Sequence, residues 1–121
     1  MNSFIEEICQ KQRGAERDFK EEWQAIRYLV GEKIFAMLGT NGEGKQIVTL
    51  KCEPHKAEHL RQEFESVIPG YYVNKSHWNS LLLEECDVPK EVIEQMIVES
   101  YQLVYSKLTK KKKEQLRPGS E

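Results

Sequence analysis

Apolar residues recur along this chain with a helical period in some segments and a strand period in others. Near the start, Ser3 and Glu6 have the spacing of a helix capping box. One side of the same segment carries Phe4, Ile5 and Ile8. These features predict a helix that ends by residue 14, where a glycine stands.

Three short runs rich in β-branched and aromatic residues follow a charged stretch. They are Ala25–Val30, Lys33–Leu38 and Gln46–Lys51. Turn residues separate them, including Asn41-Gly42, which is a favoured hairpin sequence. The pattern predicts an antiparallel meander of these runs.

A second helix is predicted to begin at Pro54, because proline favours the first position of a helix. Its apolar residues recur at three- and four-residue steps. They are Ala57, Leu60, Phe64 and Val67. The sequence Ile68-Pro69-Gly70 is expected to end this helix, whose apolar side would lie on the sheet.

Residues 71–84 have the alternation of a strand or hairpin. One side would carry Lys75, His77 and Asn79, and the other Ser76, Trp78 and Ser80. A final helix is predicted after Asp87 and Pro89, with a broad apolar side. That side consists of Val92, Ile93, Met96, Ile97, Leu103, Val104 and Leu108. Together the elements predict an α+β fold, with an antiparallel sheet packed against helices.

Two residues of these last elements have specific expected roles. Trp78 is expected to fill the core from the strand side opposite Lys75. Ser100 falls within the apolar side of the final helix, and its hydroxyl is expected to bond back to the Met96 carbonyl.

Composition narrows the class of protein. The 121 residues are 39% hydrophobic and 31% charged, which suits one globular domain. No uncharged apolar run approaches the roughly 18 to 20 residues that cross a bilayer, so we expect a cytoplasmic protein without a membrane partner. Three cysteines without a zinc-type spacing are expected to be reduced thiols.

Charge is distributed unevenly along the chain. The net charge is −2, but residues 51–100 carry −5 and residues 101–121 carry +4. We expect residues 1–109 to form a single domain. Residues 110–121, which include the run Lys110–Lys113, are expected to form a flexible basic tail.

Two features resemble catalytic or metal-binding motifs. His55 and His59 satisfy the H-x-x-E-H pattern of inverted zinc metallopeptidases, but on a helix both would face solvent. Cys52 precedes a helix, where its pKa could fall, but a small buried thiol is the commoner case. We therefore expect no enzymatic activity, no catalytic residue, no metal site and no cofactor.

The most unusual segment runs from Pro69 to Asn79 and mixes aromatic with hydrogen-bonding side chains. Such a mixture suits recognition of a planar or anionic group, with Lys75 as a charge and His77 and Asn79 as donors. The alternative is structural: Trp78 fills the core and the asparagines of the segment hold turns.

Five motifs stand in one order along the chain. They are Lys33-Ile34-Phe35-Ala36, Leu50-Lys51-Cys52-Glu53-Pro54, Pro69-Gly70-Tyr71, Asn74-Lys75-Ser76-His77-Trp78-Asn79, and Ser100-Tyr101-Gln102-Leu103-Val104 followed by Lys107-Leu108. Over about residues 1–110 this order resembles the MmcQ/YjbR-like family of small bacterial proteins. Glu32 and Tyr72 depart from the family's pattern, which usually has glycine and often histidine there.

The resemblance implies a CyaY-like (frataxin-like) fold, also described as a double wing, and implies no enzymatic activity. For this family, DNA binding is inferred only because the fold is similar to that of certain transcription-factor DNA-binding domains. We expect a regulatory protein that binds double-stranded DNA weakly and electrostatically. The candidate nucleic-acid-binding residues are Lys33, Lys51, Lys75, His77 and Asn79.

Two alternatives stay open. In the first, the chain is a protein–protein interaction module, a small chaperone-like adaptor. It would bind a protein partner through Tyr71, Tyr72 and Trp78. The net negative charge of the chain favours this alternative over DNA binding. The second is frataxin-like metal handling on exposed acidic residues. Those residues are either Glu84, Glu85 and Asp87 or Glu6 and Glu7. Convergence of the candidate lysines on one face would favour DNA binding.

Overall fold

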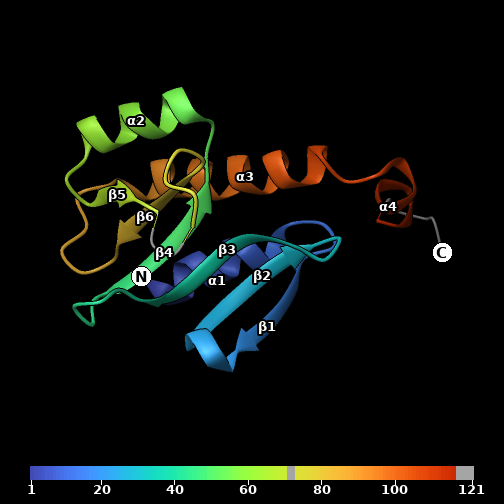
Figure 1. The fold of residues 1–121 in the computed structure, drawn as a ribbon, viewed down its shortest axis with the longest axis horizontal. Helices are drawn as coiled ribbons and strands as arrows, with labels where there is room; N and C mark the ends of the chain where they lie inside the picture. The colour runs from blue at the N-terminus through green and yellow to red at the C-terminus, as the bar shows by residue number, and fades with distance from the viewer. Residues whose placement is uncertain (71–72, 117–121) are drawn as a thin grey trace.

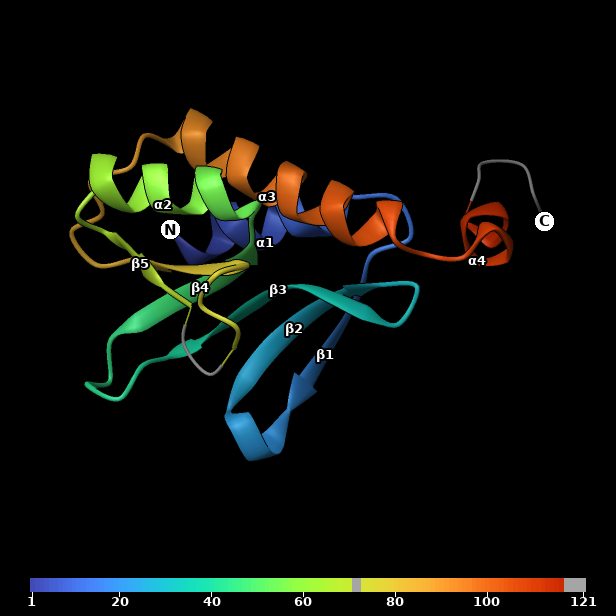
Figure 2. The ribbon, with the colours of Figure 1, turned by 45° about the horizontal axis from the view of Figure 1, so that its top comes forward.

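In the computed structural model, which describes residues 1–70 and 73–116, a six-stranded antiparallel sheet organises the molecule (Figure 1). Its strands lie in the order β1-β2-β3-β4-β6-β5. Helices α1 (Asn2–Lys11), α2 (Pro54–Glu63) and α3 (Lys90–Ser106) cover one face (Figure 2). The α+β class and the antiparallel sheet packed against helices are therefore confirmed.

The strand bounds confirm the predicted meander and add strands to it. They are β1 (Glu16–Lys20), β2 (Ala25–Val30), β3 (Lys33–Thr40), β4 (Gln46–Lys51), β5 (Val67–Pro69) and β6 (Trp78–Leu82). Strand β1 was not predicted from the sequence, because charged residues surround its one apolar residue, Phe19. Backbone pairing with β2 holds this strand, and a short 3-10 turn, η1 (Glu21–Trp23), joins the two. Figure 2 shows this hairpin projecting away from the helices.

Two helices differ from their predicted bounds. The cap residue of α1 is Met1, which makes no side-chain capping bond, so Ser3 lies inside the helix and the predicted capping box is wrong. The chain turns extended at Phe64, which ends α2, and Val67 belongs to β5 rather than to the helix. The N-cap of α2 is Glu53, whose side chain accepts two backbone N–H bonds.

The core lies between the helices and the sheet. Its largest fully buried side chains include Tyr28, Phe35, Ile5, Leu50, Leu81, Ile93 and Ile97. The ring of Tyr101 meets that of Phe35 edge-on, with centroids 5.4 Å apart. Helix α3 thus forms a main wall of the core, as its apolar side predicted.

Ser100 joins α3 to two strands. Its Oγ donates to the Phe35 carbonyl at 2.6 Å and accepts the Lys51 N–H at 2.8 Å. The predicted bond to the Met96 carbonyl is therefore wrong. Phe35 is skipped in the pairing of β2 with β3, and its carbonyl takes the serine as partner.

The chain continues beyond α3 into a short helix, α4 (Lys110–Gln115), capped by Thr109. Leu116 lies over Gly14, which has φ +73°; a Cβ there would come within 2.6 Å of Leu116 Cδ2. Residues 117–121 lie outside the described residues. The boundary at residue 109 and a flexible tail stay predictions. None of the described helices has the length and apolar composition to span a membrane.

Candidate functional site

The residues immediately before β6 form a turn closed by Asn74. Its Oδ1 accepts a hydrogen bond from the Ser76 N–H at 2.9 Å, and its carbonyl accepts one from the His77 N–H at 3.2 Å. Within the segment predicted as a strand or hairpin over residues 71–84, the described strand β6 therefore begins only at Trp78. Lys75 and His77 are exposed on this turn.

The sheet fixes both ends of the turn. The Cys52 N–H donates to the His77 carbonyl at 2.7 Å, and the Gly70 N–H donates to the Trp78 carbonyl at 2.9 Å. Both bonds extend strand pairing beyond β4 and β5. The Lys75 Nζ adds a bond to the Gly70 carbonyl at 3.2 Å. The turn is consequently held as a continuation of the sheet rather than as a loose loop.

Arg61 of α2 connects the turn to the buried Asn79. Its Nη1 donates to the Lys75 carbonyl at 3.1 Å and to Asn79 Oδ1 at 2.8 Å. Asn79 is only 1% exposed, and its Nδ2 donates to the Ala57 carbonyl at 3.2 Å. The prediction that Asn79 shares a solvent face with Lys75 is wrong, because strand alternation starts at Trp78 and directs Asn79 inward.

Arg61 was not among the residues singled out from the sequence. The signal was available, since Arg61 lies one helical turn after Ala57, on the side of the helix predicted to face the sheet. What the sequence could not supply is that this side of α2 meets the turn before β6.

Lys51 and Trp78 are direct partners across β4 and β6. The Lys51 Nζ lies 5.9 Å from the centroid of the indole ring. Trp78 is only half-buried, so the expectation that it fills the core is wrong, and the neighbouring Asn79 points inward instead. Burial lowers the pKa of Lys51, and the nearby Lys107 ammonium lowers it further.

The candidate lysines gather at one end of the sheet. Pairing of Ala36 with Leu50 places the start of β3, where Lys33 is exposed, beside the end of β4. The turn with Lys75 and His77 lies at the same end, because Trp78 pairs with Lys51. Among the described residues, no acidic side chain forms an ion pair with Lys33, Lys51 or Lys75.

A cleft of about 270 Å³ opens between α2 and α3 over the end of β4. Its apolar lining consists of Leu50, Leu60, Met96 and Leu103. An ion pair between Lys56 and Glu99 spans the two helices at the rim. Cys52 also lines the cleft, but burial raises the pKa of its thiol, which opposes the thiolate form that a nucleophile needs.

The two histidines of the H-x-x-E-H pattern, His55 and His59, are both exposed on α2, as the helical geometry predicted. Within residues 1–70 and 73–116, no three His, Cys, Asp or Glu side chains gather as a metal-binding group. Of the acidic residues named for metal handling, Asp87 instead accepts the backbone N–H groups of Glu65 and Ser66.

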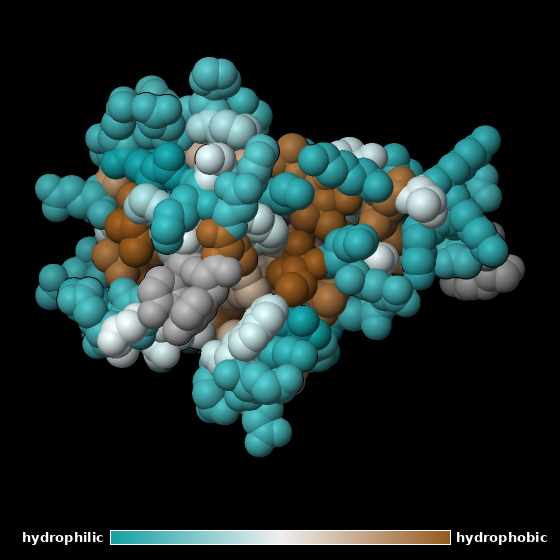
Figure 3. Space-filling model, in the orientation of Figure 1, coloured by the Kyte–Doolittle hydropathy of each residue, from teal (hydrophilic) through white to brown (hydrophobic). Residues whose placement is uncertain are grey.

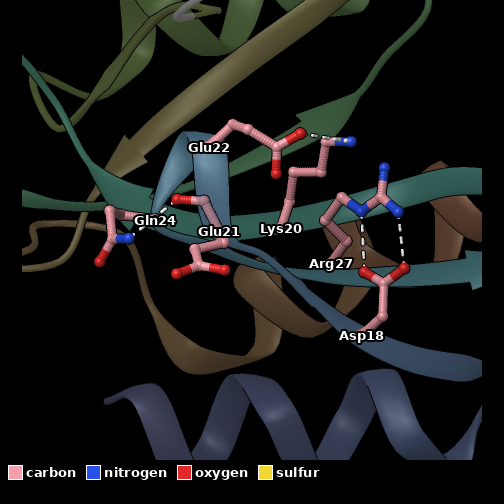
Figure 4. Close-up of polar contacts among 6 residues, drawn as sticks. All are labelled: Asp18, Lys20, Glu21, Glu22, Gln24 and Arg27. Atoms are coloured by element: carbon pink, nitrogen blue, oxygen red, sulfur yellow. Dashed lines mark hydrogen bonds and ion pairs between the residues drawn. The ribbon is translucent and has the colours of Figure 1, made fainter.

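The open face of the sheet carries a second candidate surface, at the β1–β2 hairpin. Trp23 is 51% exposed, with the Lys20 Nζ at 5.7 Å and the Arg27 Cζ at 5.8 Å from its ring centroid. Figure 4 shows that both cations have acidic partners. Arg27 binds both oxygens of Asp18, at 2.8 and 2.6 Å, and Lys20 pairs with Glu22 at 3.2 Å. This surface is therefore aromatic and locally balanced in charge.

A groove of about 430 Å³ lies beside Trp23. Its described lining includes Ala25, Met37, Ile47 and Val73. Figure 3 views this open face and shows hydrophobic surface bounded by hydrophilic side chains. Tyr71 and Tyr72, which were expected to form a protein-binding surface with Trp78, lie outside the described residues.

Comparison with known sequences gives a consistent set of relatives. The model of the YjbR family matches residues 11–103. YjbR of Escherichia coli K12, an uncharacterised protein, is 32% identical over 114 residues, which are 94% of this chain and 95% of that protein. YyaQ of Bacillus subtilis is 40% identical over 67 residues, covering 54% of this chain and 55% of that protein.

Solved structures share the fold. A Deinococcus radiodurans protein with a DUF419 domain superposes with a TM-score of 0.81 at 26% identity, covering 97% of this chain and 91% of that chain. A Pseudomonas syringae protein superposes with a TM-score of 0.70 at 26% identity, covering 85% of this chain and 97% of that chain.

Proposed function

This chain belongs to the YjbR family, and on that premise we propose that it is a non-enzymatic, cytoplasmic regulatory protein that binds double-stranded DNA. In this proposal, Lys51 and Lys75 contact backbone phosphates and His77 donates a hydrogen bond beside them. Lys33, at the same end of the sheet, supplies a further phosphate contact.

One observation carries the proposal: a hydrogen-bonded turn presents Lys75 and His77 beside Lys51, and no described acid pairs with either lysine. Because the turn is already fixed by Asn74, Arg61 and the sheet, binding costs little ordering of the backbone. Cations without acidic partners on a fixed backbone suit a polyanion whose charges repeat at fixed spacing.

The acidic body limits the expected affinity. Residues 51–100 carry a net charge of −5, which repels phosphate at a distance. We therefore expect a dissociation constant on the order of micromolar or weaker at physiological salt, with mainly electrostatic contacts. We propose no base-specific contacts, because the Asn79 side chain, which could have bonded to a base, is buried inside the protein.

Fluorescence anisotropy with a labelled duplex tests this function. Binding is expected at about 50 mM salt, where screening is weak. The double variant Lys75→Ala with His77→Ala is expected to bind several-fold more weakly, because it removes both side chains while the backbone bonds of the turn remain.

The matched control is Lys45→Ala, an exposed lysine in the β3–β4 turn at the opposite end of the sheet. Its affinity for the duplex should equal that of the unmodified chain. The proposed function would be contradicted if the duplex did not bind at low salt. It would also be contradicted if Lys45→Ala weakened duplex binding as much as the double variant does.

A protein–protein interaction function is the second candidate, favoured by the exposure of Phe19 (55%) and Trp23 (51%) on the β1–β2 hairpin. Large exposed aromatics beside a groove are typical of binding hot spots. If the duplex titration shows no binding, this hairpin becomes the leading binding surface. Metal handling receives no support from the acidic residues described above.

A further inference from the structure

Strand β1 forms one edge of the sheet and pairs only with β2 in the part of the chain that the structure describes. Figure 1 and Figure 2 show the β1–β2 hairpin extending away from the helices, with no other described helix or strand beside its outer edge. The backbone N–H and C=O groups along such an edge can pair with a strand of another chain.

Exposed aromatic side chains accompany this edge. Phe19 of β1 is 55% exposed, and Trp23, which follows in η1, is 51% exposed. Charged residues on an edge strand usually discourage pairing with another chain, whereas large apolar side chains left in water favour it. Because β1 has both, the order of its charges decides which partner strand fits.

The order of charges in β1 is complementary to itself. Residues 17–21 are Arg, Asp, Phe, Lys and Glu. In an antiparallel pair of two such strands related by two-fold symmetry, the residue at the centre faces itself, because facing residues point to the same side of the sheet. Phe19 is the one uncharged residue of β1, so every other centre within the strand would place like charges opposite each other. With Phe19 at the centre, Asp18 faces Lys20 of the second copy.

The ion pairs already present around β1 leave room for this contact. Asp18 accepts two bonds from Arg27, and Lys20 pairs with Glu22 at 3.2 Å (Figure 4). A carboxylate can accept further hydrogen bonds, and an ammonium group has three donors. A bond from Lys20 of one copy to Asp18 of the other would therefore join the two existing pairs into a chain of alternating charges.

We propose that β1 pairs antiparallel with β1 of a second copy, about a two-fold axis at Phe19, so that one sheet continues through a homodimer. The paired segment is short, so the interface is small and the dissociation constant is expected to be on the order of 0.1 mM. The proposal does not rest on DNA binding. It names a partner for the β1–β2 hairpin, and a failure of self-association would leave both candidate functions standing.

Sedimentation equilibrium of the full chain at about 50 mM salt, where screening is weak, tests the proposal. Lys20→Asp and Asp18→Lys are each expected to weaken self-association about tenfold or more, because each places like charges opposite each other in both halves of the dimer. Glu58→Lys is the control, an exposed residue of α2, which packs beside β5 and β6. It should associate as the unmodified chain does. Absence of a dimer in the unmodified chain, or equal association of all three variants, would overturn the proposal.

An equal mixture of Lys20→Asp and Asp18→Lys tests the register. In a mixed dimer the acidic positions of the first variant face the basic positions of the second, so the mixture is expected to associate about tenfold or more tightly than either variant alone. Lys20→Asp mixed with Glu58→Lys has the same total charge but keeps one pair of facing acids, and it should not match that gain. Equal gains in both mixtures, or no gain in the first, would contradict the register.

Urea unfolding of each variant shows whether it is folded at the temperature of the measurement. If Asp18→Lys were unfolded, Phe19→Asp would replace it. This change alters an exposed side chain and places two carboxylates opposite each other at the axis. Loss of self-association by folded Phe19→Asp would support the pairing, and unchanged self-association would contradict it.

Discussion

Ser100 stands among the apolar side chains of α3 and is fully buried, yet both of its hydrogen bonds cross to the sheet. Replacement by alanine would leave the Phe35 carbonyl and the Lys51 N–H without this partner. An unsatisfied buried polar group costs about 1 to 3 kcal/mol. The serine therefore holds α3 at a fixed distance from β3 and β4.

We predict that Ser100→Ala lowers the free energy of unfolding by about 1 to 3 kcal/mol, measured by urea denaturation. Ser106→Ala on the same helix is the control, because among the described residues its exposed hydroxyl bonds only to the Leu103 carbonyl of the same helix. The control should stay within about 0.5 kcal/mol of the unmodified chain. Alanine favours helix more than serine does, so similar losses in both variants would show that the cost does not arise from the two bonds to the sheet.

Glu6 links α1 to the sheet through a carboxylate. It accepts hydrogen bonds from the Tyr28 hydroxyl at 2.6 Å and from Arg17 Nε at 3.0 Å. The Tyr28 bond, and to a smaller extent Arg17, lowers the pKa of Glu6 below its ordinary value of 4.5. The resulting stabilisation is complete above pH 4.5 and is lost as the pH falls through the lowered pKa.

Glu6→Gln should therefore reduce the free energy of unfolding by about 1 kcal/mol at neutral pH, since the carboxylate is partly screened by solvent. The difference from the unmodified chain should shrink as the pH falls below 4.5. Glu7→Gln, at an exposed neighbour paired with Lys11, provides the control. A pH-independent deficit in Glu6→Gln would contradict this role for the carboxylate.

For single residues, the sequence predicted which side chains are exposed better than it predicted which face of a strand each side chain points to. The exposure of Lys75, His77, His55 and His59 follows from polarity and helical geometry and is confirmed. Asn79 and Trp78 were assigned to the wrong sides, because alternation fixes a face only once the first strand residue is known. The Asn74 turn that sets this starting point depends on contacts with α2 and β4.

Among the elements, the turn before β6 depends on Gly70. A Cβ at this position would lie 2.7 Å from Trp78 Cβ, 2.9 Å from the Trp78 carbonyl oxygen and 2.9 Å from Val73 Cγ2. Two of these atoms are fixed by the strand, so the backbone must move to make room. Close approach of β5 to β6 therefore requires glycine here.

Gly70→Ala is predicted to cost about 1 to 3 kcal/mol in urea unfolding and to weaken duplex binding, because it displaces the turn that carries Lys75 and His77. Gly44→Ala serves as the comparison. Its φ is +77° with nothing within 4 Å, so it should cost about 1 kcal/mol in backbone strain and leave duplex binding unchanged. Unchanged stability and binding in Gly70→Ala would refute the role given to this turn.

The sequence predicted the helices and strands whose apolar residues recur with a clear period. It did not predict the strands that form only because a neighbouring strand pairs with them. Strands β2, β3 and β4 and helix α3 carry strong apolar patterns. Strand β1 and the three-residue β5 lack such patterns and form because a neighbouring strand supplies their hydrogen bonds. That partner is a tertiary feature, which local periodicity does not contain.

Across the whole molecule, positive charge is concentrated at the C-terminal end of α3 and on α4, whereas residues 84–99 are acidic. Two lysines of α4 are engaged within the protein. Lys112 pairs with Glu32 at 3.6 Å, and Lys113 donates to the Ser106 carbonyl at 3.1 Å. Lys110 and Lys111 remain exposed and available to bind phosphate.

Ending the chain at Leu108 should weaken duplex binding and flatten its salt dependence. Removal of one phosphate interaction reduces the slope of log K against log salt by about 0.9. The weakening caused by Lys75→Ala with His77→Ala should persist in the shortened chain, because the turn is held by the sheet and α2. If the shortened chain no longer distinguished that double variant, the binding would reside in the tail.

The most direct test of DNA binding at this turn is an amide chemical-shift titration of the full-length protein with an unlabelled duplex at about 50 mM salt. We predict saturable shifts at Lys51, Lys75, His77 and Trp78, with smaller shifts in α4. Shifts confined to residues 110–116, or to the β1–β2 hairpin around Trp23, would contradict the proposed function.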